Sequence, residues 1–109
     1  MRDEVDAALQ AVSIGRAADL LALTARNLID DSIGPIQWEF IIKACLACES
    51  ALKVCEFALD CLNADEVDIY PEVMGAHRLL TQEMFNLRER IDELVYQANE
   101  NGYVVHTAN

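Results

Sequence analysis

Residues 71–101 read PEVMGAHRLLTQEMFNLRERIDELVYQANEN. Side chains that suit a buried seam recur in this stretch at alternating steps of four and three residues: Val73, His77, Leu80, Met84, Leu87, Ile91, Leu94 and Ala98. That spacing lays one seam along a helix that pairs with other helices in a left-handed supercoil. Pro71 suits the first helical turn, and Asn101 with Gly102 is typical of a left-handed cap. The stretch therefore predicts a long helix over residues 71–101.

Two further helices are predicted upstream, over about residues 3–32 and 35–62. Pro35 separates them, because a proline pushes the residue before it out of the helical region and itself fits a first helical turn. A loop is expected from Asn63 to Tyr70, where short polar side chains compete for backbone hydrogen bonds, and the tail 102–109 is expected to be irregular. The 109 residues thus predict a single all-α domain, with three long helices in a small bundle or antiparallel hairpin arrangement.

The first predicted helix changes phase along its length. Its second half carries one seam, made of Ile14, Ala18, Leu21, Ala25 and Leu28. Val5, Leu9 and Val12 fall on a different face when the helix is continued at 100° per residue. The change occurs near Gly15, and glycine costs about 1 kcal/mol in a helix interior. We therefore expect a kink or break near Gly15, with a first piece that packs separately.

The second predicted helix is apolar almost all round. Its expected core face consists of Ile41, Ala44, Cys48, Ala51, Leu52, Cys55, Ala58, Leu59 and Leu62. The expected water-facing side consists of Glu39, Lys43, Glu49, Ser50, Lys53, Glu56 and Asp60. Trp38, Ile42, Leu46 and Phe57 project onto that polar side, and two other helices cannot surround this one. The four residues predict a protein interface, for a partner or a second copy; the alternative is that the N-terminal piece of helix one covers them.

The net charge of -11 restricts the classes of partner. It would repel a phosphate backbone, whose binding depends on Lys and Arg displacing counterions, so direct nucleic-acid binding is not expected. The same charge would speed encounter with a basic protein surface. An alternative function is an acidic anti-defence or DNA-mimic protein, whose carboxylates occupy a basic nucleic-acid-binding surface.

No residue group predicts catalysis, a metal site or a cofactor site. Cys45 and Cys48 form a Cys-x-x-Cys pair, but it lies mid-helix in an apolar segment, whereas a redox pair draws a low thiol pKa from a helix start or from cations. The other candidate zinc ligands are Cys55, Cys61, His77 and His106, without a second pair at ligand spacing. The acidic cluster Asp60, Asp65, Glu66, Asp68 and Glu72 lacks the twelve-residue calcium loop with its central glycine. Small core residues explain the thiols best, and a non-enzymatic protein is expected.

The beginning of the chain does not predict secretion. Residues 1–6 are mostly charged, and no run of about 18 uncharged apolar residues follows. We therefore expect a cytoplasmic protein that makes no membrane contact, and whose four cysteines remain thiols in that reducing compartment.

The cysteine-bearing segment 45–55, CLACESALKVC, together with length, acidity and three helices, resembles the QslA-like family of small antiactivators of LuxR-type quorum-sensing regulators. The resemblance covers the general format of the chain and no diagnostic motif, so it assigns no contact residues. It implies binding to the ligand-binding domain of a LuxR-type transcription factor and disruption of that factor's dimer. The residues themselves predict a small regulatory homodimer that binds another protein through helix two.

Overall fold

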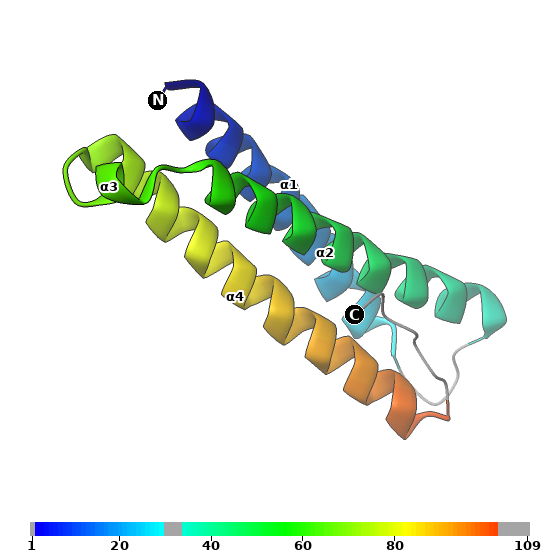
Figure 1. Ribbon diagram of the computed structural model, residues 1–109. Helices are drawn as coiled ribbons and strands as arrows, with labels where there is room; N and C mark the ends of the chain where they lie inside the picture. Colours follow the sequence, from blue (N-terminus) through cyan, green and yellow to red (C-terminus); the bar gives the residue numbers. More distant parts are fainter. Residues whose placement is uncertain (1, 30–33, 103–109) are drawn as a thin grey trace.

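The computed structural model describes residues 2–29 and 34–102, and every regular element in these ranges is a helix. Three long helices, α1 (Arg2–Asn27), α2 (Pro35–Cys61) and α4 (Pro71–Glu100), pack against one another. Figure 1 shows that α1 and α4 run in the same direction and that α2 runs in the opposite direction beside both. The bundle is elongated, with extents of 52 × 20 × 15 Å. The predicted all-α fold is confirmed.

The ends of the second and third predicted helices agree with the structure to within one residue. The backbone N–H of Gly34 donates to Oε1 of Gln37 (3.1 Å) at the start of α2. Gly102 follows α4 with a φ of 83°, the left-handed conformation that its lack of a Cβ allows. The expected loop from Asn63 to Tyr70 contains an additional short helix, α3 (Ala64–Val67). Asn63 caps it, because its Oδ1 accepts a hydrogen bond from the Asp65 N–H at 3.0 Å.

The first helix is shorter than predicted. It ends at Asn27 and not near residue 32; the last predicted residues, 30–32, lie outside the described ranges. The N–H of Leu28 donates to the Ala25 carbonyl (3.0 Å) and the N–H of Ile29 to the Arg26 carbonyl (3.1 Å). These tighter bonds over three residues close the last turn and satisfy carbonyls that a longer helix would have used.

Of the predicted kink or break near Gly15, the break is wrong, because α1 is one unbroken helix from Arg2 to Asn27. Gly15 is buried against α4. A Cβ at this position would lie 2.6 Å from Cγ of Glu83 and 3.3 Å from Cδ1 of Leu87. The glycine therefore lets α1 and α4 approach closely, and this packing offsets its poor helix propensity.

Alanine dominates the core face of α1, which corrects the predicted seam. The buried residues of α1 are Val5, Ala8, Ala11, Val12, Gly15, Ala18, Ala22 and Ala25. Ile14, Leu21 and Leu28, which were expected in the core, are 49%, 48% and 42% exposed. Small side chains on this face allow the neighbouring helices to pack near the α1 backbone, so the larger side chains beside them remain outside.

The core faces of α2 and α4 follow the sequence prediction closely. Every residue of the predicted α4 seam is buried except His77, which is half-buried. All predicted core residues of α2 are buried except Leu59, which is half-buried against the core. Glu49, a predicted water-facing residue of α2, is instead buried, and so is Glu83 of α4. The seven-residue repeat therefore located most of both core faces, and the largest departures are two acidic side chains.

Candidate protein-binding surface

The four predicted interface residues have different environments in the structure. Phe57 is 72% exposed and Leu46 is 39% exposed. Ile42 is half-buried and packs against the core. Trp38 is only 3% exposed, so its predicted place on the outer surface is wrong. Trp38 precedes the buried Cys45 and Leu52 by seven and fourteen positions, a spacing that keeps residues on one side of a helix in a bundle.

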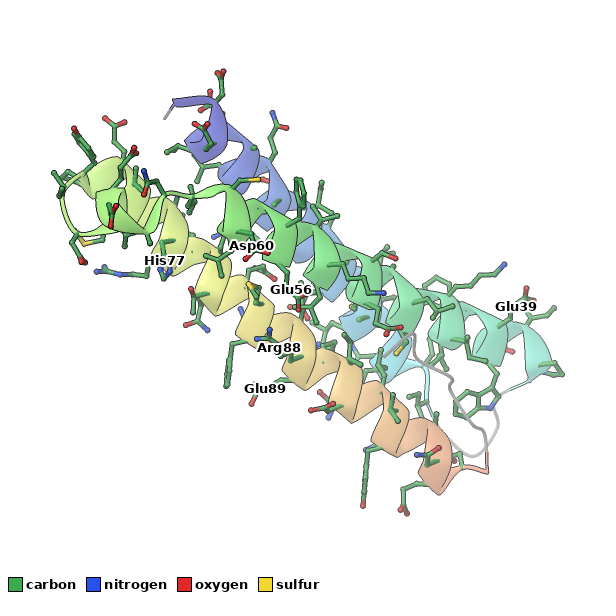
Figure 2. All side chains as sticks on the ribbon, in the orientation of Figure 1. Glu39, Glu56, Asp60, His77, Arg88 and Glu89 are labelled. Carbon is green, nitrogen blue, oxygen red and sulfur yellow. The ribbon has the colours of Figure 1, made fainter. Side chains whose placement is uncertain are left out.

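The outer surface of α2 combines exposed apolar side chains with charged neighbours. Phe57 and Leu46 are joined by Ile36, which is 81% exposed and which the sequence reading missed. Ile36 and Phe57 lie 21 residues apart, so a seven-residue repeat places both on one side of the helix. Lys43 and Glu39 form a charged pair on the same helix, with Nζ of Lys43 3.1 Å from Oε1 of Glu39. Figure 2 shows Glu39 near the start of α2. Aromatic and aliphatic anchors within a polar rim are typical of protein-binding surfaces.

Ion pairs join α4 to both other helices. The pairs are Arg16–Glu83 (3.8 Å), Arg90–Asp19 (2.9 Å) and Arg26–Glu93 between α1 and α4, and Arg88–Glu56 (3.5 Å) between α2 and α4. Figure 2 shows Glu56 and Arg88 on the facing sides of α2 and α4. Between exposed side chains, as in Arg88–Glu56, such pairs contribute little stability, about 0–1 kcal/mol each. They do identify which flank of α1 and which flank of α2 faces α4.

The contact between α1 and α2 has a different chemistry. The thiol of Cys48 donates to the Ala18 carbonyl (3.4 Å), and the thiol of Cys55 donates to the Ala11 carbonyl (3.5 Å). The segment from Ala11 to Ala18 in α1 therefore lies alongside the segment from Cys55 back to Cys48 in α2, a step of seven residues in each helix. These bonds fix the antiparallel register of the two helices.

An apolar surface, which we call the α1/α2 face, follows the outside of that contact. It consists of two rows of residues that repeat every seven positions: Ala7, Ile14, Leu21 and Leu28 from α1 and the turn after it, and Phe40, Ala47, Val54 and Cys61 from α2. Each row lies on the flank of its helix that is turned away from α4. None of the eight residues is charged, and the five large ones are between 38% and 49% exposed.

The register brings the two rows into matching levels. Continuing the pairing of Ala18 with Cys48 along both helices places Ile14 close to the level of Val54 and Leu21 close to that of Ala47. The rows extend over 21 residues of each helix, or about 31 Å. An alternative seam built on the alanines and Gly15 of α1 would have identified this surface from the sequence, because it moves Ile14, Leu21 and Leu28 out of the core.

The cysteines do not form a reactive centre. Cys45, Cys48 and Cys55 are buried free thiols, and Cys61 is an exposed one. Burial raises the pKa of Cys45 to about 11 and that of Cys48 to about 12. Both thiols are therefore protonated at neutral pH, whereas redox-active pairs depend on a lowered pKa. Within residues 2–29 and 34–102, no group of three or more His, Cys, Asp or Glu is placed to hold a metal ion.

Glu83 is a buried carboxylate in the contact between α1 and α4. It is 5% exposed, and its Oε2 makes no hydrogen bond within the described part of the chain. Burial raises its pKa, the negative charge of Asp19 raises it further, and the Arg16 guanidinium lowers it. A single buried carboxyl group packed against Gly15 has no open space for a substrate, so it is a structural feature of the helix contact.

A hollow on the surface of α4 does not combine reactive groups from several helices. It is an open hollow of about 620 Å³, lined only by α4 residues: Met74, His77, Arg78, Thr81, Gln82 and Phe85. His77 lies there without a cysteine or carboxylate in the lining. The hollow therefore offers neither a nucleophile paired with a base nor a ligand set for a metal.

Comparisons with protein-family models, with curated proteins and with solved structures give no match for this chain. The resemblance to small antiactivators therefore stays a prediction. Among the described residues, no helix is both long enough and apolar enough to cross a membrane.

Proposed function

We propose that the chain is a non-enzymatic regulatory protein that binds a target protein through the outer surface of α2. The observation that carries this proposal is the exposure of Phe57 and Ile36, at 72% and 81%, on one side of the helix. The two side chains lie about 31 Å apart along the helix, with Leu46 between them in sequence, so they are separate anchors that different pockets of a target would bury. Each would contribute roughly 1.5–3 kcal/mol before ordering costs are subtracted.

The charge of the chain supports a target with a basic surface around its pocket. Nineteen acidic residues face only eight basic ones, so the potential around the molecule is negative. Complementary charge raises association rates and fixes orientation more than it raises affinity. The anchors on α2 would then supply most of the binding energy.

The proposed target is the ligand-binding domain of a LuxR-type transcription factor in the cytoplasm. This choice follows from the resemblance of segment 45–55 and the overall format to small antiactivators. A protein that covers a regulator's dimer contact inhibits it without chemistry. The free, protonated thiols of Cys45 and Cys48 fit a reducing compartment and a role in packing.

The test measures binding of the purified chain to the ligand-bound domain of such a regulator. We expect the wild-type chain to bind the domain in titration calorimetry, to dissociate its dimer in light scattering, and to reduce operator binding by the full-length regulator. Phe57→Asp should weaken binding at least about tenfold, because a charge then occupies the anchor's pocket. Tyr96→Asp is the matched control, since Tyr96 is an exposed aromatic residue on α4; it should bind as the wild type does.

Two outcomes would overturn the proposal. Equal affinity of Phe57→Asp and the wild type would exclude the outer surface of α2, and absence of binding by the wild type would exclude this class of target. The DNA-mimic alternative predicts a third pattern. Binding to a nucleic-acid-binding protein would fall steeply with salt and would survive Phe57→Asp.

A further inference from the structure

We infer that a second copy of this chain docks on the α1/α2 face and that the protein is a homodimer. In its central contact, helices α1 and α2 of one copy face helices α1 and α2 of the other. The target surface proposed above is centred on the opposite side of α2 from the core. The inference does not depend on the identity of the target. It rests on the spacing, the charge and the area of the α1/α2 face.

The spacing of the face fits packing between helices. Residues that repeat every seven positions stay on one side of a helix in a left-handed bundle and insert between the side chains of a facing helix. Here two neighbouring helices present such rows in matching levels, including Ile14 with Val54 and Leu21 with Ala47. A second copy presents the same pair of rows, so both copies can bury their large side chains between the other's rows, as a two-fold contact requires.

The charge of the face favours a second copy over other occupants. Two copies each carry a net charge of -11, so an acidic contact surface would prevent them from approaching. The eight positions of the face carry no charge. The neighbouring positions Gln10, Ala17 and Thr24 on α1 are also uncharged. A basic target would instead be attracted by carboxylates at its docking surface, and this face lacks them.

The large side chains of the face supply about half of the area that each partner of a stable dimer buries. The five large side chains, Ile14, Leu21, Leu28, Phe40 and Val54, are each 38–49% exposed; with roughly 200 Å² for a fully exposed large side chain they offer about 400 Å² of apolar surface. Ala7, Ala47, Cys61 and the uncharged α1 neighbours extend it along about 31 Å of the bundle. A standard interface buries about 800 Å² on each partner, and a self-associating one has an apolar centre of this kind.

The test compares two adjacent leucines of α1. Leu21 belongs to the face, whereas Leu20 is more exposed, at 66%, and points away from it. Sedimentation equilibrium of the full chain should show a wild-type dimer. Leu21→Lys should raise the dimer dissociation constant at least about 100-fold, because each dimer contains the altered position twice. Leu20→Lys, which makes the same change in charge and helix propensity, should change it less than about threefold.

Circular dichroism distinguishes lost association from lost folding. Both lysine variants should keep the wild-type helix signal, since the Leu20 and Leu21 side chains are 66% and 48% exposed. If Leu21→Lys does not fold, Val54→Lys on the α2 row takes its place in the comparison. Raising the salt concentration should strengthen the wild-type dimer, because salt screens the repulsion between two acidic copies.

Three results would overturn the inference. The first is a wild-type chain that is still monomeric at about 100 μM, because a standard interface associates more tightly than that. The others are equal effects of the two leucine substitutions on the dimer dissociation constant, and a dimer that weakens as salt is added. A wild-type monomer whose target binding is lost on Leu21→Lys would assign the face to a helix of the target instead. Leu46→Asp separates the two proposals, because Leu46 lies on the outer surface of α2 and none of its helix neighbours belongs to the α1/α2 face, so the change should weaken target binding and leave a dimer. Failure of one proposal therefore leaves the other testable.

Discussion

Substituting the buried Gly15 by alanine tests the close packing of α1 against α4. In an exposed helix interior this change stabilises a protein by about 1 kcal/mol, because alanine is the better helix former. Here the new Cβ would lie 2.6 Å from Cγ of Glu83 and 3.3 Å from Cδ1 of Leu87. Glu83 is nearly fully buried, and its Cγ is too close to its own backbone to swing away, so the helices must separate or Glu83 must leave its rotamer.

Overpacking of this kind costs about 1–3 kcal/mol. A first contact as short as 2.6 Å belongs to the upper half of that range, so after the gain in helix propensity we expect Gly15→Ala to lower the unfolding free energy by about 1–2 kcal/mol. For a chain of this size that corresponds to a fall in Tm of at least about 4 °C. Urea and thermal unfolding followed by circular dichroism, at one fixed protein concentration, measure both quantities.

Gly75 provides the matched control, because it also lies inside a helix but a Cβ there would meet no atom within 4 Å. Gly75→Ala should therefore stabilise the protein by about 0.5–1 kcal/mol, a change of the opposite sign. Adding Glu83→Ala to Gly15→Ala removes the conflicting Cγ, and the double variant should be more stable than the sum of the two single effects predicts. A Gly15→Ala protein as stable as the wild type would refute the close-packing argument.

Two further predictions concern the buried titratable groups. The folded-state pKa of Glu83 is raised above its ordinary value of 4.5, so the stability that its protonated form contributes is lost as pH rises through the folded pKa. The unfolding free energy of Glu83→Gln should therefore increase relative to that of the wild type as pH is raised from about 4.5 to 8. A constant difference between the two proteins in urea titrations over that range would contradict the burial of the charge. The Leu21→Lys variant leaves Cys61, a member of the α1/α2 face, uncovered by a second copy, so maleimide should label it rapidly. The buried Cys45, Cys48 and Cys55 should react only after unfolding, because their thiols are inaccessible and protonated at neutral pH. Peptide mass spectrometry distinguishes the sites, and rapid labelling of Cys48 in the native state would contradict the packing of α2 against α1.

Negative charge and exposed apolar side chains act on different partners of this molecule. The charge is carried by side chains spread over the chain, and it opposes the approach of nucleic acid, and of a second copy wherever carboxylates would meet. The α1/α2 face and the outer surface of α2 each carry large apolar side chains that remain in water. A small chain with two such surfaces is suited to hold a second copy with one and a target with the other.

The sequence by itself determined the helices and most of two core faces. The four-three spacing from Val73 to Ala98 locates the buried side of α4, and Pro35 and Pro71 mark the starts of α2 and α4 to the residue. These features are local, because periodicity and backbone restriction act within a few residues along the chain. The exposure of Leu46 and Phe57 was also predicted from the pattern of α2 alone.

Only the tertiary structure decided which face of α1 is buried. The sequence offers two seams on this helix, and the larger side chains of Ile14, Leu21 and Leu28 favoured the wrong one. The alanine seam prevails because Gly15 admits Glu83 and Leu87 of α4, and because the carbonyls of Ala11 and Ala18 accept hydrogen bonds from α2 thiols. The burial of Glu83 follows from the same packing. Hydrophobicity ranks residues one at a time, whereas close approach between helices depends on the shape that small residues leave for a neighbour, and that neighbour is distant in the sequence.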